Sequence, residues 1–87
     1  MARHISHIVY IIQSKKNNSY LYKGYTTNLQ KRLTYHNSGN SQHTNKNRPW
    51  QLIFYSSFQS KQKAKAFEKY LKTASGIAFM RKRLIDY

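Results

Sequence analysis

The chain has no cysteine, so its core must hold without disulfides or thiolate metal sites. A core built from 87 residues is marginal, because it buries only roughly 60% of the surface that the unfolded chain exposes. This length leaves room for one domain, which we expect to span residues 1–87. The longest apolar run, Ile8 to Ile12, is far shorter than the ~20 residues that a membrane span needs. We therefore expect one small cytoplasmic domain without a membrane segment.

Acidic residues are almost absent. Glu68 and Asp86 stand against 16 lysines and arginines, which gives a formal net charge of +14. A charge of this size indicates a polyanionic partner, nucleic acid first and an anionic membrane surface second, with an affinity that falls steeply with salt. A surface that only binds phosphates has no use for Glu68, which lies mid-chain inside a helical pattern. A hard divalent cation held against a phosphate does have a use for it.

Three short segments have the pattern of β-strands. Residues 7–13 are apolar and β-branched, and a polar turn at 14–19 separates them from a second strand ending at Tyr25, so the first pair forms a hairpin. Pro49 and Trp50 introduce a third strand at 51–56, and Trp50 is expected in the core.

Helical segments fill the rest of the pattern. Thr27 or Asn28 caps a helix at 29–37, and Ser60 caps a second helix at 61–73. Ser75-Gly76 is expected to break the chain before a short terminal helix at 77–85. The order β-β-α-β-α-α predicts an α+β fold in which helices flank a small three-stranded, antiparallel sheet.

Two side chains of the first helix are candidates for chemistry. Leu29 and Leu33 form its core stripe, and Arg32 and His36 lie four residues apart, so they stack on one face beside that stripe. Taken alone, such an arginine is more often a solvated charge than a catalyst. Taken alone, such a histidine is more often a packing or capping residue.

Glu68 lies at the margin of the buried stripe of the second helix, which Ala64, Phe67 and Leu71 form. An acid on such an edge is costly without a partner. The partner is either one of the neighbouring lysines, as in many structural ion pairs, or a bound cation.

The hairpin carries two tyrosines and a glycine of interest. If position 10 pairs with position 22, the phenols of Tyr10 and Tyr22 lie side by side, although tyrosine is also an ordinary strand residue. Gly24 weakens a strand, so it needs a reason such as a bulge or close backbone approach to a ligand.

Together these residues resemble the GIY-YIG nuclease family, whose relatives include the N-terminal nuclease domain of UvrC and homing endonucleases. The resemblance runs from Ile8 to Leu84 and is closest to the small stand-alone bacterial members. It is carried by Val9-Tyr10, by Tyr22-Lys23-Gly24 twelve residues on, by Arg32 and His36, by Gln42-His43-Thr44-Asn45, by Arg48-Pro49-Trp50, and by the run AFEKYLK around Glu68.

The resemblance implies a role for each matching position. Tyr10 and Tyr22 are the motif tyrosines, Gly24 closes the second motif, Arg32 is the catalytic arginine, His36 stands where relatives have His or Tyr, and Glu68 is the metal-binding glutamate. The chain departs from the pattern at Ile8, which replaces the first glycine. It also departs at Tyr25, where some relatives carry a lysine that activates a phenol, so this activation must come from elsewhere here, with Lys23 and metal-bound water as candidates.

These residues fit hydrolysis of a phosphodiester. Arg32 would hold the phosphate, His36 would orient the water or phosphate or pass a proton, and either Tyr10 or Tyr22 would take the proton from water. Such a phenol, with an ordinary pKa near ~10, would need nearby cations to lower its pKa. One Mg²⁺ or Mn²⁺ ion on Glu68 suffices, since a two-metal site needs more carboxylates than the chain offers.

The remaining basic side chains are expected to contact phosphates, which conveys little sequence information. They are Lys15, Lys16, Lys23, Lys46, Arg48, Lys61, Lys63, Lys65, Lys72 and Arg81 to Arg83.

The expected function is therefore that of a metal-dependent endonuclease acting on DNA in repair or recombination, and associated with the nucleoid when bound. We expect low sequence specificity or recognition of DNA shape, with branched DNA, single-stranded DNA and RNA all open. The main alternative is a basic nucleic-acid-binding module on the same fold that does not cut, and net charge does not distinguish the two. The oligomeric state stays open.

Overall fold

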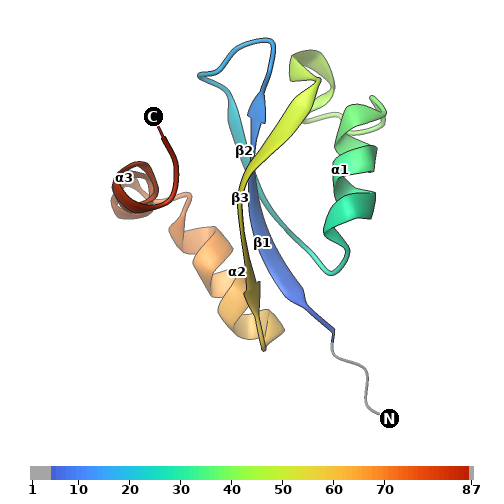
Figure 1. The fold of residues 1–87 in the computed structure, drawn as a ribbon. Helices are drawn as coiled ribbons and strands as arrows, with labels where there is room; N and C mark the ends of the chain where they lie inside the picture. The colour runs from blue at the N-terminus through green and yellow to red at the C-terminus, as the bar shows by residue number, and fades with distance from the viewer. Residues whose placement is uncertain (1–4, 87) are drawn as a thin grey trace.

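A three-stranded sheet with helices on both faces forms the fold in the computed structural model, which describes residues 5–86 (Figure 1). The strands are β1 (His7–Ser14), β2 (Leu21–Thr26) and β3 (Trp50–Phe58). Their order in the sheet is β2-β1-β3, and β1 is antiparallel to both neighbours. This arrangement confirms the predicted α+β class and the antiparallel sheet.

The helices are α1 (Leu29–Asn37), the 3₁₀ turn η1 (Asn45–Asn47), α2 (Lys61–Tyr70) and α3 (Ala74–Arg83). Capping side chains begin α1 and α2 as expected, since Asn28 accepts a hydrogen bond from the backbone N–H of Lys31 and Ser60 accepts one from that of Lys63. None of the helices within residues 5–86 is long and apolar enough to cross a membrane.

The junction between α2 and α3 differs from the sequence prediction. Ser75-Gly76 does not break the chain but lies in the first turn of α3, which Thr73 caps by accepting from the backbone N–H of Gly76. A Cβ at Gly76 would lie 2.5 Å from the carbonyl carbon of Tyr70 and 2.9 Å from Cα of Leu71. Glycine is therefore needed there for close approach of α3 to the end of α2, and not to end a helix.

The hairpin register also differs from the pairing that would set the two phenols opposite each other. Tyr10 pairs with Gly24, and Ile12 pairs with Tyr22. Because side chains alternate along a strand, a shift of two residues keeps the same side chains on the same face. Tyr10 and Tyr22 consequently still lie together, now in a diagonal relation, with the glycine directly opposite Tyr10.

The sheet separates two apolar clusters. On the face covered by α2 and α3, Val9 and Ile11 belong to a core completed by Ala64, Leu71 and Met80. On the face covered by α1, the buried members are Tyr10, Ile12 and Trp50. The expectation that Trp50 belongs to the core is confirmed, since its side chain is 5% exposed.

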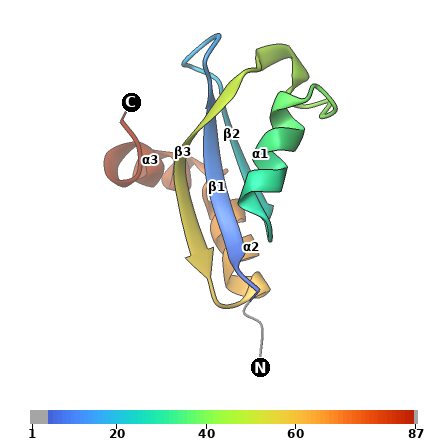
Figure 2. The same cartoon turned by 45° about the vertical axis from the view of Figure 1, so that its right-hand side comes forward.

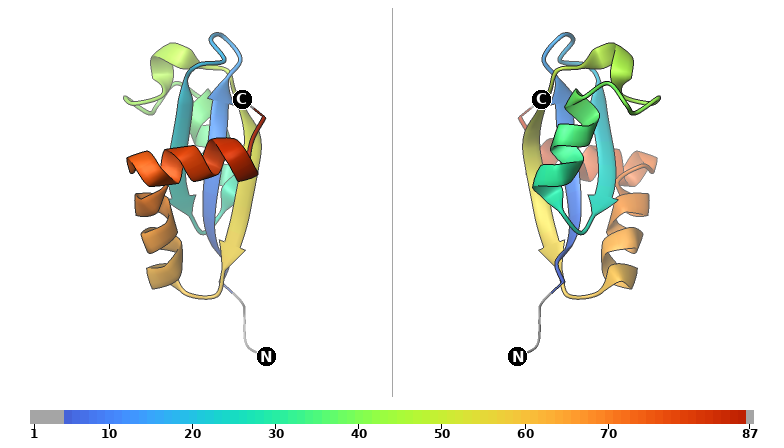
Figure 3. Two further views of the ribbon diagram at one scale, coloured as in Figure 1. Left: turned by 90° about the vertical axis from the view of Figure 1, so that its left-hand side faces the viewer. Right: turned by 90° about the vertical axis from the view of Figure 1, so that its right-hand side faces the viewer.

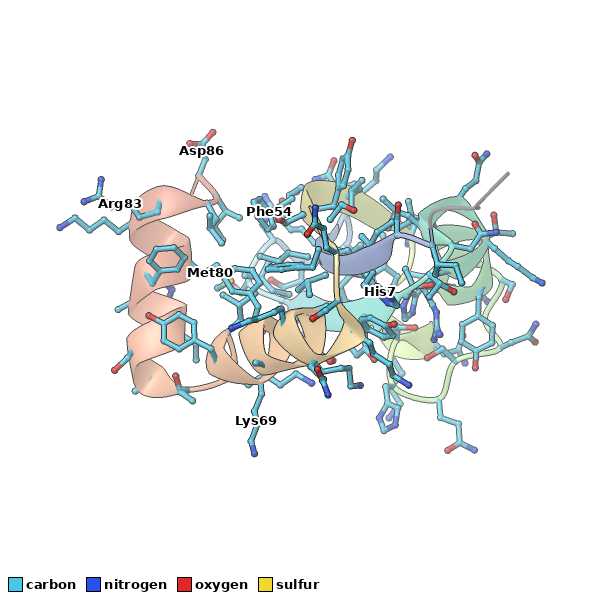
Figure 4. All side chains as sticks on the ribbon, turned by 90° about the horizontal axis from the view of Figure 1, so that it is seen from below. His7, Phe54, Lys69, Met80, Arg83 and Asp86 are labelled. Atoms are coloured by element: carbon cyan, nitrogen blue, oxygen red, sulfur yellow. The ribbon has the colours of Figure 1, made fainter. Side chains whose placement is uncertain are left out.

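The helices lie differently on the two faces. Figure 2 shows α1 alone over its face of the sheet, and Figure 3 shows α3 crossing the strands while α2 runs along the β2 side. In Figure 4, Met80 points from α3 toward the sheet and Arg83 points away from it, while Lys69 points away from α2 into solvent. The buried polar side chains of His36 and Thr44 lie on the face that α1 covers.

Candidate active site

Three aromatic rings meet between β1, β2 and α1. The ring of His36 lies edge-on to Tyr22 with a centroid distance of 4.9 Å, and it lies 5.8 Å from the ring of Tyr10. The two tyrosine rings are 6.4 Å apart. The structure thus brings together three residues that are separated by up to 26 positions in sequence.

The hydroxyl of Tyr10 and the imidazole of His36 form a buried hydrogen bond. The phenol oxygen lies 2.7 Å from Nε2, and each residue is only 1% exposed. On the other side of the ring, Nδ1 lies 3.0 Å from the hydroxyl oxygen of Thr44, which is fully buried. Both ring nitrogens of His36 are consequently used inside the protein, so this side chain has no nitrogen left for a water or a phosphate.

Burial sets the protonation state of this pair. It raises the pKa of the Tyr10 phenol well above its ordinary value, and the neighbouring Tyr22 adds to the rise. Burial also lowers the pKa of His36 below its ordinary value, with the positive charge of Arg32 acting in the same direction. At neutral pH the histidine is therefore neutral and the Tyr10 phenol keeps its proton.

Arg32 and Glu68 both act on this centre through their charges. The guanidinium of Arg32 lowers the pKa of the Tyr10 phenol and the carboxylate of Glu68 raises it, both by less than burial does. Arg32 is partly buried, its guanidinium carbon lies 5.8 Å from the centroid of the Tyr35 ring, and it borders an open pocket of about 550 Å³. Two opposite charges from α1 and α2 therefore reach one buried phenol.

Glu68 is the acid that the sequence placed at the inward margin of α2, and its side chain is 14% exposed. Its oxygens lie 3.4 Å from the ammonium of Lys65 and 3.3 Å from that of Lys72. The structural ion pair considered from sequence is thus present, with two lysines and not one. Lys65 also lies over the ring of Tyr25, 5.1 Å from its centroid.

Gly24 has a reason that the sequence did not supply. A Cβ at this position would lie 2.6 Å from Cζ of Tyr10 and 2.9 Å from Cε1. The glycine therefore makes room for the Tyr10 ring, and neither a bulge nor a ligand is needed to explain it.

Lys23 does not lie beside the phenols. Its ammonium donates a hydrogen bond to the backbone carbonyl of Leu71, 3.2 Å away at the end of α2, on the opposite face of the sheet from Tyr22. Burial lowers the pKa of Lys23, and the charges of Lys72 and Arg81 lower it further. The structure gives no support to its expected roles in activating a phenol or binding a phosphate.

The other predicted phosphate contacts divide into two groups. Lys15 and Lys16 in the β1–β2 turn lie near the loop that carries Lys46 and Arg48, since the ammonium of Lys16 is 3.4 Å from the carbonyl oxygen of Lys46. A second group lies along α2 and α3, where Lys61, Lys63, Lys65, Lys72 and Arg81 to Arg83 are exposed.

The sequence alone assigned no role to the residues whose hydrogen bonds hold the loop after α1 in place. The indole N–H of Trp50 donates to the carbonyl of Thr44, and the side chain of Asn37 bonds the backbone N–H and carbonyl of Trp50. The signal for Thr44 was its place in the motif at 42–45, but only tertiary contact shows that its hydroxyl reaches His36.

Comparison with known proteins identifies the family of the chain. Residues 6–81 match the sequence model of the GIY-YIG catalytic domain. The chain belongs to the GIY-YIG family. This family is of nuclease type, and the matched range includes Tyr10, Tyr22, Arg32, His36 and Glu68.

The relatives are small bacterial proteins that share the name UPF0213. The chain is 41% identical over 70 residues to "UPF0213 protein SH2523" of Staphylococcus haemolyticus, covering 79% of this chain and 83% of the relative. It is 40% identical over 68 residues to "UPF0213 protein YazA" of Bacillus subtilis, covering 77% and 67%.

A solved structure shows the same fold. The solution NMR structure of the UPF0213 protein BH0048 from Bacillus halodurans superposes with a TM-score of 0.54 at 29% identity, covering 88% of this chain and 83% of that one. The small stand-alone type expected for this GIY-YIG chain is thereby confirmed, while the printed names of these relatives state no substrate.

Proposed function

We propose that this protein is a metal-dependent endonuclease that hydrolyses phosphodiester bonds in DNA with one divalent ion and weak sequence preference. The observation that carries the proposal is the cluster of Tyr10, Tyr22 and His36, whose buried phenol has a pKa that the charges of Arg32 and Glu68 influence. Arg32 from α1 and Glu68 from α2 both act on the phenol of Tyr10, which packs against Tyr22 and His36. A protein that only bound phosphates would gain nothing from a carboxylate there.

Arg32 is the residue that would hold the scissile phosphate. Its guanidinium lies beside an open pocket that is lined by Lys31, Tyr35 and residues 26–28. A planar guanidinium donates two parallel hydrogen bonds to a phosphate and can stabilise the charge that develops on it during hydrolysis.

Tyr22 is the better of the two tyrosines as the group that takes a proton from water. It is partly exposed, whereas Tyr10 is buried and bonded to His36. Because burial raises the pKa of Tyr10, forming a phenolate there is unfavourable. Tyr10 and His36 would then hold the site in shape, and Tyr22 would meet the water.

Glu68 fits a single hard cation. Its carboxylate remains partly accessible, and no group of three or more His, Cys, Asp or Glu side chains that could hold a metal exists within residues 5–86. Mg²⁺ and Mn²⁺ accept one carboxylate and complete their shells with water and phosphate oxygens. A bound ion would neutralise charge on the phosphate, and Glu68 would have to release Lys65 and Lys72 to hold it.

A non-catalytic nucleic-acid-binding module is the second candidate. The observation in its favour is that Glu68 is already paired with two lysines, as a structural acid would be. In that case Arg32 would be one more phosphate contact, and no metal would be needed.

Incubation with supercoiled plasmid, branched DNA, single-stranded DNA and RNA at low salt separates these candidates. The endonuclease converts supercoiled plasmid to nicked circles with Mg²⁺ or Mn²⁺ and stops in EDTA. Tight binding in gel shifts with no cutting of any of the four substrates, with either metal, would favour the binding module.

A further inference from the structure

The buried polar chain behind the candidate site contains one residue that the proposed mechanism does not use. Thr44 is fully buried, and within the part of the chain that the structure describes the only partner of its side-chain oxygen is Nδ1 of His36. The opposite nitrogen, Nε2, meets the hydroxyl of Tyr10. Three side chains thus form one line from the loop at 40–48 to the phenol.

A neutral imidazole has one donor and one acceptor, so this line has only two arrangements. In the first, Tyr10 donates to Nε2 and Nδ1–H donates to Thr44. In the second, Thr44 donates to Nδ1 and Nε2–H donates to the oxygen of Tyr10. Each arrangement leaves one hydroxyl proton without a partner among residues 5–86.

The surroundings of the two hydroxyls differ. The proton left over in the first arrangement belongs to Thr44, which is fully buried. The backbone carbonyl of Thr44 accepts a hydrogen bond from the indole N–H of Trp50. The proton left over in the second arrangement belongs to Tyr10, whose ring centroid lies 6.4 Å from that of the partly exposed Tyr22. A buried donor without an acceptor is costly. Because Tyr22 is partly exposed, a water or bound oxygen beside it can accept the proton of Tyr10, whereas Thr44 is fully buried.

We propose that Thr44 fixes His36 as the Nε2–H tautomer, so that Tyr10 receives a hydrogen bond from His36 and keeps its own proton for an oxygen beside Tyr22. Thr44 is then a positioning residue that acts through His36. Each hydroxyl or N–H in the line polarises the next one, and the line ends at Tyr10, beside the side chain that we assign as the proton acceptor.

The direct test needs no variant of Thr44. In ¹⁵N-histidine-labelled protein at neutral pH, two-bond ¹H–¹⁵N correlation spectra report which nitrogen of each ring carries the proton, and a His36→Gln sample identifies the His36 signals. The proposal expects the proton on Nε2. A proton on Nδ1, or on both nitrogens, overturns it.

Substitution at Thr44 gives the second test. Thr44→Val keeps the shape and removes the donor, so the Nδ1 signal of His36 should move to that of an unbonded nitrogen, while Thr44→Ser keeps the wild-type signal. Near-ultraviolet circular dichroism checks that Thr44→Val is folded. An unchanged His36 spectrum in the folded variant contradicts the proposal.

The activity readout alone rests on the proposed function. Thr44→Val should lower kcat roughly five- to tenfold, the effect of one lost neutral hydrogen bond, with KM unchanged and restored turnover in Thr44→Ser. If no substrate is cut, the proposed function fails, and the histidine spectra still decide the role of Thr44.

Discussion

The hydroxyl of Tyr10 lies 2.7 Å from Nε2 of His36, and both side chains are 99% removed from solvent. This contact joins the central strand β1 to α1 on the face of the sheet that α1 covers. It also distinguishes the two motif tyrosines, since Tyr10 is buried and bonded to His36 whereas Tyr22 is partly exposed.

That separation predicts different results for two equivalent substitutions. Tyr22→Phe should lower the nicking rate by roughly 10²- to 10⁴-fold with little change in stability, because it removes the proton acceptor. Tyr10→Phe should reduce the free energy of unfolding by about 1–3 kcal/mol, because it leaves Nε2 of His36 buried without its partner. Nicking assays and urea unfolding measure the two effects. Equal stability losses in both variants would contradict the distinction.

His36 predicts a specific dependence of stability on pH. Its pKa in the folded protein lies below the ordinary value of 6.5, because burial and Arg32 disfavour the charged ring. The unfolded chain therefore binds a proton more readily, so the stability contributed by neutral His36 is complete above pH 6.5 and is lost as pH falls through the folded pKa. Urea unfolding from pH 7.5 downward should show this loss.

The matched control is His36→Gln, which cannot titrate. Its unfolding free energy should change less over the same pH range than that of the wild type, because the other histidines are common to both. Parallel curves for the two proteins would show that His36 does not titrate differently in the folded and unfolded states.

Gly24 should tolerate no side chain while Tyr10 is present. Gly24→Ala places a Cβ inside the Tyr10 ring contact and should destabilise the protein by about 1–3 kcal/mol, the usual cost of overpacking. The same substitution in a Tyr10→Val background should cost much less, since the ring has gone. A double-mutant cycle by thermal or urea unfolding measures the coupling, and additive effects would argue against a steric reason for Gly24.

The two lysines on Glu68 should compete with a cation. Lys72→Met removes an ammonium 3.3 Å from the carboxylate, so Mn²⁺ should bind several-fold more tightly in calorimetry while stability changes by less than about 1 kcal/mol. Lys69→Met is the control, since that side chain points away into solvent (Figure 4). The same Mn²⁺ affinity in both variants would remove Glu68 from the metal site.

The strands, the caps and the two sides of α1 could be predicted because they depend on local patterns. The β-branched run at 7–13 and the capping side chains Asn28 and Ser60 each predict their element from neighbouring residues alone. Arg32 and His36 could be placed together because a four-residue spacing on a helix fixes their relation.

The rest depends on contacts between distant segments. Gly76 looks like a helix breaker from sequence, yet it is needed for packing against the carbonyl of Tyr70. The hairpin register depends likewise on how the Tyr10 ring packs against Gly24. The hydrogen bond between Thr44 and His36 depends on how the loop after α1 folds back onto that helix. A local sequence pattern carries no information on such contacts.

The most direct test of the central claim measures cutting and binding in the same samples of wild type, Arg32→Ala and Glu68→Ala. Supercoiled plasmid with Mn²⁺ reports nicking, and gel shifts without metal report binding. The account predicts that both variants lose nicking by more than about a hundredfold, as expected when a transition-state charge loses its partner, while both still bind DNA. Wild-type nicking rates in either variant would contradict it, as would plasmid nicking by the wild type that persists in EDTA.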